Sequence, residues 1–439
     1  MENFGGEIAL RLLLLSLFIV CSVWGAELHF DLYKKESSNP SHTLLVIGGV
    51  HGDEPGGYFA ASFLVKYYDI KKGALWVVPN LNFDSIIRFR RGIYGDMNRK
   101  FASIKKSDPD YTIVNDIKKI ILNEQVDLIL NLHDGRGYYR EKWENTIFNP
   151  FAWGQACIID QEEIDGCKFG DLNKIAQKVN SALNNKKLKK NHHAFHIKNT
   201  KTKFKDEQMK LSLTYFAITH NKPALAIETS KNINDLATKI YYQLNAIEEF
   251  MKILEIEFER EFELSIETIN NLLKNDLDYI VINDNIVLPL KNIKKSIRFF
   301  PLTERKISFI CDDPLVTVVE RGKNYVIYRG YKKLTALYPQ YFKSGCEKRG
   351  MEFVIDGKKE YVQIPSVVKV KKNFKVLASD DIRVNVIGFS KKGVLNENNI
   401  EIEKKECQDR YSIDSFHKMY RVEFYKDKSF CGSVIVYFD

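Results

Sequence analysis

The chain has 439 residues, of which 44% are hydrophobic, 12% aromatic and 28% charged. A chain of this length is expected to form two or three domains, and its hydrophobic share is sufficient for folded cores. The low numbers of proline (11) and glycine (24) exclude collagen-like and low-complexity proteins. The aromatic content excludes a largely disordered chain. We therefore expect a multidomain globular protein.

The net charge is +9, from 66 basic and 57 acidic residues. This mild excess favours anionic partners without identifying one. The sequence contains no C-x-x-C zinc pair, no P-loop and no aromatic RNA-binding strand motif. We therefore expect no nucleic-acid partner.

The N-terminus resembles an export signal. Arg11 is followed by a mostly apolar run over residues 12–23, which is shorter than the roughly 20 residues needed to span a bilayer. The small residues Gly25 and Ala26 follow it. This pattern predicts a signal peptide over residues 1–26 and a periplasmic protein without stable membrane insertion after cleavage. An uncleaved membrane anchor is the alternative.

Removal of Cys21 with the signal peptide leaves six of the seven cysteines. An even number in an exported chain permits disulfides, and six cysteines allow 15 connectivities. The sequence does not choose among them. The simplest connectivity pairs neighbours, namely Cys157 with Cys167, Cys311 with Cys346, and Cys407 with Cys431.

The first half of the chain alternates between strand and helix patterns. Short apolar runs predict strands, and longer runs with helical periodicity predict helices. The alternation predicts a mixed α/β sheet flanked by helices, in a domain spanning residues 27–251. The expected strands are residues 42–50, 74–80, 127–135 and 223–230, and the expected helices are 58–68, 116–126, 171–188 and 234–258.

From about residue 262 the pattern changes to closely spaced β-rich runs, such as 278–290 and 308–330. Another group begins near Tyr361 and continues to the C-terminus. We expect a β-rich middle domain over residues 252–346. The last domain, residues 347–439, is expected to be an immunoglobulin-like β-sandwich.

The first polar motif is GGVHGDEPGG, residues 48–57, directly after a predicted strand. His51 and Glu54 are spaced so that a turn entering a helix can direct both at one point. An imidazole and a carboxylate suit zinc, and a catalytic zinc usually takes three protein ligands. The alternative is a loop histidine beside a glutamate that is stabilised by a helix dipole.

The second motif is LNLHDG, residues 130–135, in which His133 ends an apolar strand. It can supply a third ligand at the carboxyl edge of the sheet, where α/β proteins place their sites. Asp134 is expected to begin the following turn, although a carboxylate here can also orient a ligand histidine.

Glu228 interrupts the apolar strand ALAIETS, residues 224–230. A buried, unpaired carboxylate is costly, so Glu228 is either paired structurally or used as a base, and near a metal the second reading is favoured. The segment RFRRGIYGDMNRKF, residues 88–101, is rich in arginine. Arginine binds carboxylates bidentately, although a solvated basic loop is the alternative.

Together, H-x-x-E, D-x-N-R, the strand histidine and the strand glutamate resemble the zinc carboxypeptidases of the funnelin type. The most specific match is DMNRKF, residues 96–101, and the resemblance covers about residues 40–250. It implies one zinc ion per chain, held by His51, Glu54 and His133, with Glu228 as general base.

The resemblance also implies that Asn98 and Arg99 hold the terminal carboxylate of the substrate. An upstream arginine would stabilise the oxyanion; we assign Arg91, with Arg88 and Arg90 as alternatives. The family's Asn-Pro-Asp-Gly segment is reduced to PNLNFD, residues 79–84. The tyrosine that digestive members carry on a mobile loop has no counterpart. Both departures argue against a general protein-digesting enzyme.

The whole layout looks like the peptidoglycan DL-carboxypeptidases of helical Gram-negative cells. This resemblance implies trimming of muramyl tripeptide to dipeptide with release of meso-diaminopimelate, which shapes the cell wall. Trp153 and Thr214 would line the pocket for diaminopimelate, and other cell-shape proteins are candidate partners. The alternatives are an aspartoacylase-like N-acyl amino acid amidohydrolase and a non-catalytic wall-binding protein.

Residues 186–210 contain nine lysines. They either form a positive rim that attracts anionic wall peptides or belong to a solvated loop.

Overall fold

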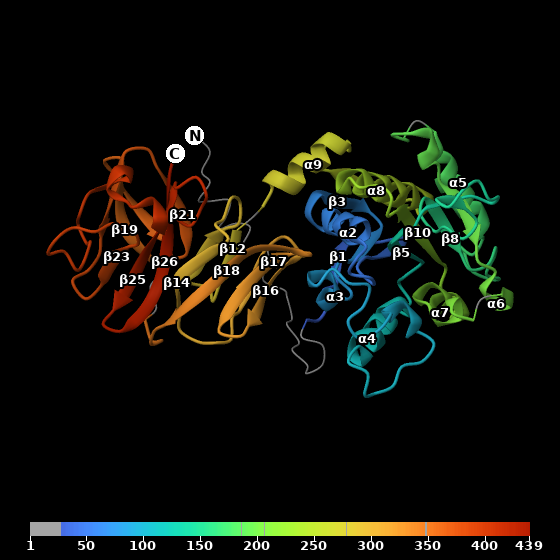
Figure 1. Ribbon diagram of the computed structural model, residues 1–439, viewed down its shortest axis with the longest axis horizontal. Coiled ribbons are helices and arrows are strands. Elements are labelled where there is room, and N and C mark those ends of the chain that lie inside the picture. Colours follow the sequence, from blue (N-terminus) through green and yellow to red (C-terminus); the bar gives the residue numbers. More distant parts are fainter. Residues whose placement is uncertain (1–27, 186, 206, 278, 347–348) are drawn as a thin grey trace.

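The computed structural model describes residues 28–185, 187–205, 207–277, 279–346 and 349–439. The molecule is elongated, with a helix-covered domain at one end and two β-rich domains following it in line (Figure 1). None of the helices in these ranges is both long and apolar enough to cross a bilayer. The predicted signal peptide lies outside the described residues.

A seven-stranded mixed sheet organises the first domain, in the order β1-β4-β2-β5-β10-β8-β9. β4, β2, β5 and β10 run parallel, whereas β1 and β8 are antiparallel to β4 and β10. β2 and β4 are fully buried and almost entirely apolar, as is usual where helices cover both faces. The bounds are β1 Tyr33–Glu36, β2 Thr43–Ile47, β4 Ala74–Val78, β5 Leu128–Gly135, β8 Ala156–Ile159, β9 His196–Asn199 and β10 Ala224–Ser230.

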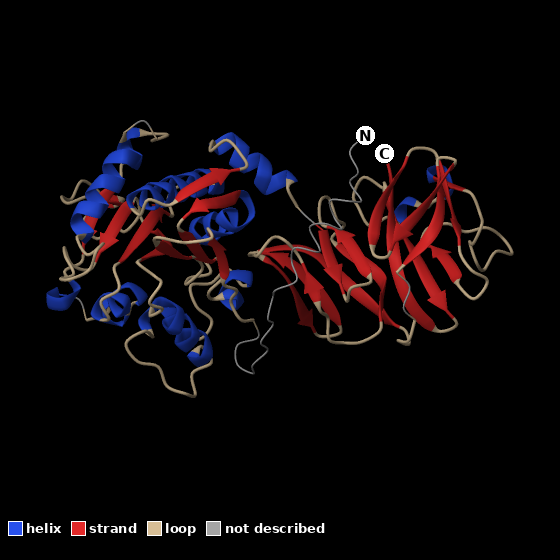
Figure 2. Ribbon diagram, turned by 180° about the vertical axis from the view of Figure 1, so that it is seen from behind, coloured by secondary structure: helices blue, strands red, loops and turns tan. Residues whose placement is uncertain are grey.

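Helices cover both faces of this sheet (Figure 2), which confirms the predicted class of fold. One layer holds α2 (Pro55–Tyr67), α5 (Leu172–Asn184) and α8 (Leu236–Ile253). The other holds α3 (Phe83–Ile87), α4 (Tyr111–Ile121), α6 (Thr202–Lys205) and α7 (Leu213–Thr219). The remaining strands of the domain form two small sheets, β3 (Tyr68–Lys72) with β11 (Glu257–Arg260), and β6 (Tyr138–Tyr139) with β7 (Phe148–Asn149).

The predicted strands and three of the four predicted helices lie close to the observed elements. The helix expected over residues 116–126 begins earlier, at Tyr111, and ends at Ile121. It ends there because the chain turns before β5, with the backbone N–H of Val126 bonded to the carbonyl of Asn123 at 3.1 Å.

Helix α9 (Ile266–Asn275) was not predicted. Ser265 caps it by accepting a hydrogen bond from the backbone N–H of Thr268. Its single fully buried residue, Ile269, joins the hydrophobic core of the first domain. The first domain therefore takes part of its core from beyond residue 251.

Two sheets form the β-rich middle region, ordered β13-β12-β15 and β14-β18-β17-β16. In the second sheet, β16, β17 and β18 are antiparallel neighbours, and β14 pairs in parallel with β18. The strands are β12 Tyr279–Ile282, β13 Ile286–Pro289, β14 Ser296–Leu302, β15 Phe309–Ile310, β16 Val316–Arg321, β17 Asn324–Arg329 and β18 Lys332–Tyr341.

The C-terminal region is a sandwich of two four-stranded sheets, β20-β19-β22-β24 and β21-β26-β25-β23, as predicted. Phe353, Phe374 and Phe424 lie in the apolar cluster between them. The strands are β19 Gly350–Ile355, β20 Lys358–Gln363, β21 Ser366–Val370, β22 Asn373–Leu377, β23 Arg383–Val386, β24 Ile402–Glu403, β25 Met419–Lys426 and β26 Ser429–Phe438.

The two β-rich regions share a hydrophobic cluster, to which Tyr425, Phe430 and Ile435 of the sandwich contribute. The backbone N–H of Ser433 also donates to the carbonyl of Asn285 at 2.9 Å. The predicted division near residue 346 falls between β18 and β19, but the apolar core continues across it.

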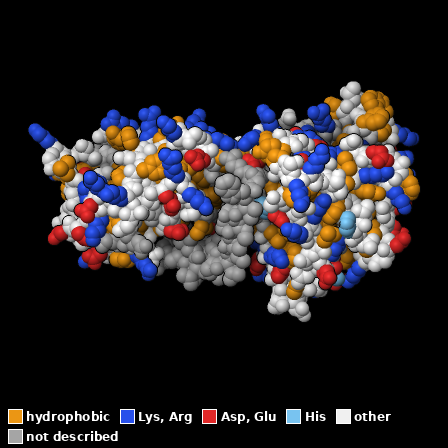
Figure 3. Space-filling view, turned by 90° about the horizontal axis from the view of Figure 1, so that it is seen from below, with side chains coloured by type: hydrophobic (Ala, Val, Ile, Leu, Met, Phe, Trp, Pro, Cys, Tyr) orange, Lys and Arg blue, Asp and Glu red, His pale blue; other side chains and the backbone are white. Residues whose placement is uncertain are grey.

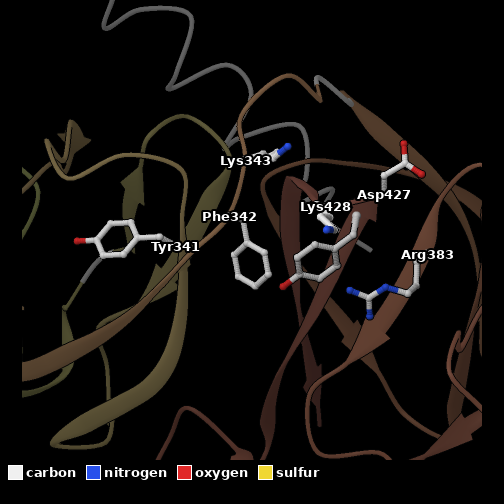
Figure 4. A pocket seen from close by; sticks show the side chains of 7 residues that line it. Tyr341, Phe342, Lys343, Arg383, Asp427 and Lys428 are labelled. Atoms are coloured by element: carbon white, nitrogen blue, oxygen red, sulfur yellow. The ribbon is translucent and has the colours of Figure 1, made fainter.

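A cavity of about 400 Å³ opens at this junction, far along the molecule from the mixed sheet (Figure 4). Figure 4 shows the ring of Tyr341 directed away from the other lining side chains, whereas the ring of Phe342 lies closer to them. The lining residues are Tyr341, Phe342, Lys343, Arg383, Tyr425, Asp427 and Lys428.

Cys346 and Cys431 form a disulfide, with their Cα atoms 4.7 Å apart. The simple pairing of sequence neighbours is therefore wrong. Cys346 immediately precedes the sandwich and Cys431 lies in β26, so the bond joins the two ends of that domain. Cys157, Cys167 and Cys407 are thiols.

Candidate active site

The predicted site residues follow the carboxyl ends of three adjacent parallel strands. His51 and Glu54 follow β2, His133 lies near the end of β5, and Glu228 lies near the end of β10. Glu228 is directly opposite His133 in the pairing of β10 with β5. Because parallel strands end at the same edge of a sheet, these distant parts of the sequence meet there.

A tight turn between β2 and α2 positions the first pair. A Cβ atom on Gly52 would lie 2.1 Å from the backbone of Ser85, so only glycine permits this close approach of α3. Pro55 then occupies the first turn of α2, immediately after Glu54. The turn therefore fixes His51 and Glu54 against the sheet edge.

His51, Glu54 and His133 form a buried cluster whose possible ligand atoms all lie within 4.8 Å of one another. Nδ1 of His51 is 3.0 Å from one oxygen of Glu54, and Nδ1 of His133 is 2.7 Å from the other. Burial by itself raises the pKa of Glu54, but the two imidazoles outweigh it and hold that pKa well below its usual value. Two imidazoles and one carboxylate suit a catalytic zinc or a similar divalent ion.

Asp96 orients the ring of His51 from its other side. Nε2 of His51 is 2.8 Å from Oδ1 of Asp96, which leaves Nδ1 facing the cluster. Metal-binding histidines commonly have such a carboxylate partner. The sequence suggested no role for Asp96 by itself, although its position in DMNRKF was the available signal.

Glu228 has a buried Oε2 that makes no hydrogen bond within the described ranges. Burial raises the pKa of Glu228 well above its usual value, and the negative charges of Glu54 and Asp134 raise it further. A carboxyl group in this state is suited to exchange protons with a reacting group beside it. The surroundings therefore fit a general base better than a structural ion pair.

Of the three candidate arginines, Arg91 reaches the cluster. Its Nη1 lies 3.1 Å from Oε1 of Glu54, and its Nε donates to Oδ2 of Asp96 at 3.0 Å. Arg88 and Arg90 are exposed. The geometry thus favours Arg91 over the two alternatives.

Asn98 and Arg99 lie in a 3₁₀ turn, η1 (Met97–Arg99). Oδ1 of Asn98 accepts a hydrogen bond from the backbone N–H of Leu213 at 2.9 Å, which brings Thr214 at the start of α7 to the same region. Nη1 of Arg99 donates to the carbonyl of Asn98 at 3.0 Å. No carboxylate of the described chain forms an ion pair with Arg99, so its guanidinium is available to an anionic ligand.

Trp153 packs with Ala156, Ile158 and Ala226 on the face of the sheet that carries Glu228. Nζ of Lys198 donates to the carbonyls of Pro150 and Ala152 at 2.8 Å and lies 4.3 Å from the Trp153 ring. Burial lowers the pKa of Lys198 to about 8. Lys198 therefore holds the segment that carries Trp153.

The lysine-rich stretch 186–210 does not form one uniform positive rim. Lys198 is half-buried, with its Nζ 4.3 Å from the centre of the Trp153 ring, and Lys187 forms an ion pair with Glu249 at 2.9 Å. Figure 3 shows lysine and arginine side chains spread over both halves of the displayed face. A single basic patch is therefore absent from that face.

The sequence suggested that Asp134 begins a turn, but the structure shows a further role for this residue. It is buried and accepts hydrogen bonds from the backbone N–H of Gly56 at 2.9 Å and from the hydroxyl of Thr229. These bonds join the end of β5 to α2 and β10. Asp134 thus holds the elements of the site together without contacting the ring of His133.

Lys231 is a further charged group at the site, for which the sequence suggested no role. Its Nζ lies 2.7 Å from Oδ2 of Asp53 and 3.5 Å from Oε1 of Glu54. Lys231 follows β10 directly, so its approach to Glu54 depends on the pairing of strands, which a sequence pattern does not reveal.

The mixed sheet and its buried His-Glu-His edge define a metal-dependent hydrolase of the carboxypeptidase class. The chain belongs to the family described as "Carboxypeptidase controlling helical cell shape catalytic", which matches residues 13–274. Residues 344–439 match "C-terminal domain of metallo-carboxypeptidase". These matches confirm the resemblance to cell-shape carboxypeptidases.

The chain is similar to the cell shape determinant protein Csd4 from Helicobacter pylori, in an apo structure and in a tripeptide-bound structure. It is also similar to an mDAP-bound structure of Csd4 described as a D,L-carboxypeptidase. In each comparison the identity is 36%, the TM-score is 0.88, and the match covers 93% of this chain and 100% of the other. No curated protein sequence matched the chain.

Proposed function

We propose that this protein is a zinc-dependent D,L-carboxypeptidase that releases meso-diaminopimelate from peptidoglycan muramyl tripeptide and leaves the dipeptide. The observation that carries the proposal is the meeting of His51, Glu54, His133 and Glu228 at one sheet edge. The bound tripeptide and mDAP of the Csd4 structures support the choice of substrate.

His51, Glu54 and His133 are the residues that would hold the zinc ion. Their buried ligand atoms lie within 4.8 Å of one another, and three protein ligands are the usual number in a catalytic zinc site. Zinc bound there supplies Lewis acidity, which lowers the pKa of water and polarises a carbonyl. Asp96 keeps Nδ1 of His51 directed at the ligand position.

Glu228 moves the proton in this scheme. Its carboxylate accepts a proton from the attacking water and returns it to the leaving amine of diaminopimelate. The unpartnered Oε2 supports this role, since nothing in the described structure competes for it. The position opposite His133 puts the carboxylate beside the proposed metal ligands.

Arg91 and Arg99 would act on different parts of the substrate. Arg99, with Asn98, binds the free terminal carboxylate, because a guanidinium can pair with both of its oxygens. Arg91 lies nearer the cluster and stabilises the negative charge that develops on the carbonyl oxygen. This arrangement would restrict cleavage to the last residue of a peptide.

Trp153 and Thr214 would line the pocket for the diaminopimelate side chain. Trp153 lies on the face that carries Glu228, and Thr214 is adjacent to the residue that binds Asn98. Lys198 supports the pocket by holding the segment next to Trp153. Replacing Trp153 with alanine should therefore raise KM for the tripeptide more than it lowers kcat.

We place the enzyme in the periplasm. The apolar run after Arg11, followed by Gly25 and Ala26, supports export through a cleaved signal peptide. A peptidoglycan substrate requires a location outside the inner membrane, which agrees with that pattern. Cell fractionation with an antibody to the protein tests this placement.

Purified protein incubated with muramyl tripeptide should release meso-diaminopimelate, and a chelator should stop the release. Added zinc should restore the activity, while metal analysis should find about one zinc per chain. N-acetyl-aspartate serves as the comparison substrate and should not be cleaved. Cleavage of N-acetyl-aspartate without cleavage of the tripeptide would overturn the proposal.

A further inference from the structure

The middle domain touches the catalytic domain through the tip of one hairpin. β17 and β18 are joined by Gly330 and Tyr331, and this tip reaches the first domain near α3 (Figure 1). Gly330 has φ +53°, and a Cβ there would lie 3.3 Å from ring atoms of Tyr58 and Phe59. The hairpin thus packs closely on α2, the helix that begins directly after Glu54.

A buried ion pair next to the turn holds this end of the hairpin in place. Nε of Arg329 donates to Oδ2 of Asp313 at 2.6 Å, and both side chains are buried. The other oxygen of Asp313 accepts a hydrogen bond from the hydroxyl of Ser62 in α2 at 3.3 Å. Asn80 of the first domain also donates to the carbonyl of Pro314 at 3.1 Å. The hairpin is therefore fixed relative to the catalytic domain.

Tyr331 at the tip contacts the loop that carries Arg91. Its ring lies 4.7 Å from the ring of Phe89 and 6.4 Å from the ring of Phe59, measured between centroids. Both distances fall within the range of attractive aromatic pairs. Tyr331 is consequently packed between helix α2 and the arginine loop, which we define as residues 88–96.

Phe89 needs such support, because it has φ +49° although it is not glycine, and its side chain is 48% exposed. A bulky residue keeps this backbone conformation only where its surroundings hold it. Within the loop, the backbone N–H of Arg90 donates to the carbonyl of Ser85 at 3.0 Å. The described partner of the Phe89 ring is Tyr331.

We propose that Tyr331 is a positioning residue for Arg91. Tyr331 belongs to the middle domain and holds the ring of Phe89. It thereby keeps Arg91, two residues further along the arginine loop, directed toward the cluster that contains Glu54. Glu54 and Asp96 hold the guanidinium from the other side at 3.1 and 3.0 Å. The middle domain thereby completes the active site.

This inference rests on the role proposed above for Arg91. Because Arg91 would act on charge that develops during the reaction, its misplacement should lower kcat and leave KM for the tripeptide nearly unchanged. A residue that merely stabilised the domain contact would lower the unfolding temperature without this selective effect on kcat.

The test is a double-mutant cycle on zinc-loaded, full-length protein with muramyl tripeptide as substrate. The variants are Tyr331→Ala, Arg91→Ala and the two combined, with Tyr331→Phe as the conservative replacement. Tyr338→Ala is the matched control, because Tyr338 is an exposed tyrosine of the same hairpin without an aromatic contact in the described structure. Each protein is also measured for zinc content and unfolding temperature.

We expect Tyr331→Ala to lower kcat about tenfold with unchanged zinc content, and Tyr331→Phe and Tyr338→Ala to retain the normal kcat. In the Arg91→Ala background, Tyr331→Ala should cause no further loss. An equal loss in both backgrounds, or an unchanged kcat, would overturn the proposal. If Tyr331→Ala does not fold, Phe89→Ala removes the same ring contact from the exposed side and must give the same result.

Failure of this proposal is distinguishable from failure of the proposed function. A wild-type protein that does not cleave tripeptide contradicts the function, whereas an active wild type with an unaffected Tyr331→Ala variant contradicts only the positioning role.

Discussion

The carboxylate of Asp96 lies 2.8 Å from Nε2 of His51, on the side of the ring opposite Glu54. Its second oxygen accepts a hydrogen bond from Nε of Arg91 at 3.0 Å. One acid therefore connects a proposed metal ligand with the arginine proposed to stabilise the oxyanion. In the proposed site, the D-x-N-R motif would therefore support the metal ligands as well as bind the substrate.

Replacing Asp96 with alanine should weaken zinc binding by about 10- to 100-fold, because the ring of His51 loses the partner that orients it. A competitive titration against a zinc chelator measures this affinity. Asp116→Ala is a suitable control, since Asp116 pairs with exposed Lys119 on the surface. Unchanged zinc affinity in the Asp96 variant would show that the contact does not orient the ligand.

Glu228→Gln should reduce kcat by about 10²- to 10⁴-fold, because the amide cannot accept and return a proton. Zinc content should not change, since Glu228 is outside the proposed ligand set. Glu249→Gln, at a half-buried position of α8 away from the cluster, is the control for loss of a negative charge. Appreciable residual activity in the Glu228 variant would remove this residue from the role of base.

The raised pKa of Glu228 also predicts a pH dependence of stability in the zinc-free protein. Burial, followed by the charges of Glu54 and Asp134, disfavours the ionised form in the folded state. A raised carboxyl pKa lowers stability as the pH rises from the unfolded value of about 4.3 through the folded value. Glu228→Gln should therefore stabilise the protein increasingly as the pH rises above about 4. Thermal unfolding of both proteins checks this, and a pH-independent difference would contradict it.

The Asp313–Arg329 pair should stabilise the junction between the first two domains. Burial by itself raises the pKa of Asp313, but Arg329 and Lys66 outweigh burial and lower that pKa overall. The stabilisation that the pair provides is therefore present above about pH 4. It is lost as the pH falls through the lowered pKa of Asp313 in the folded state.

Asp313→Asn should lower the free energy of unfolding by about 3–5 kcal/mol at neutral pH, because it leaves Arg329 buried without its anion. The difference in free energy of unfolding between the variant and the wild type should decrease at acidic pH. Asp312→Asn, at the exposed neighbouring position, should have little effect. Chemical denaturation at several pH values measures both variants, and equal losses would show that the buried pair is unimportant.

The Cys346–Cys431 disulfide should stabilise the sandwich, because it closes a loop with a sequence separation of 85 residues. Replacing both cysteines with serine should cost about 2–5 kcal/mol of unfolding free energy. A reducing agent should destabilise the wild type and leave the double variant unaffected. Cys167→Ser controls for the loss of a thiol that is not in a disulfide.

Much of the first domain could be predicted from local patterns. Apolar runs such as TLLVI and ALWVV are fully buried strands, and the alternation with helices indicated a mixed sheet. The spacing of His51 and Glu54 indicated a paired site, because both lie in one turn. Helix α9 was missed although Ile266, Ile269, Leu272 and Leu273 recur at helical spacing, because the residues from about 262 onward were assigned to the β-rich region.

Contacts between distant segments could not be predicted in the same way. The disulfide joins residues whose proximity depends on how the sandwich closes, and the nearest-neighbour pairing failed for that reason. Lys231 approaches Glu54 only because β10 and β2 both flank β5. The contact between Tyr331 and Phe89 depends in addition on how two domains pack.

By itself, the sequence determined the chemical types available to this protein: the imidazoles, carboxylates and arginines, and the strands and turns that carry them. These features are local, because hydrophobic periodicity and turn residues act over a few positions of the chain. The tertiary structure decided which groups meet, including Asp96 with His51 and Tyr331 with Phe89. The reason is that strand order and domain packing bring distant side chains together. Their separation along the chain does not predict their distance in space.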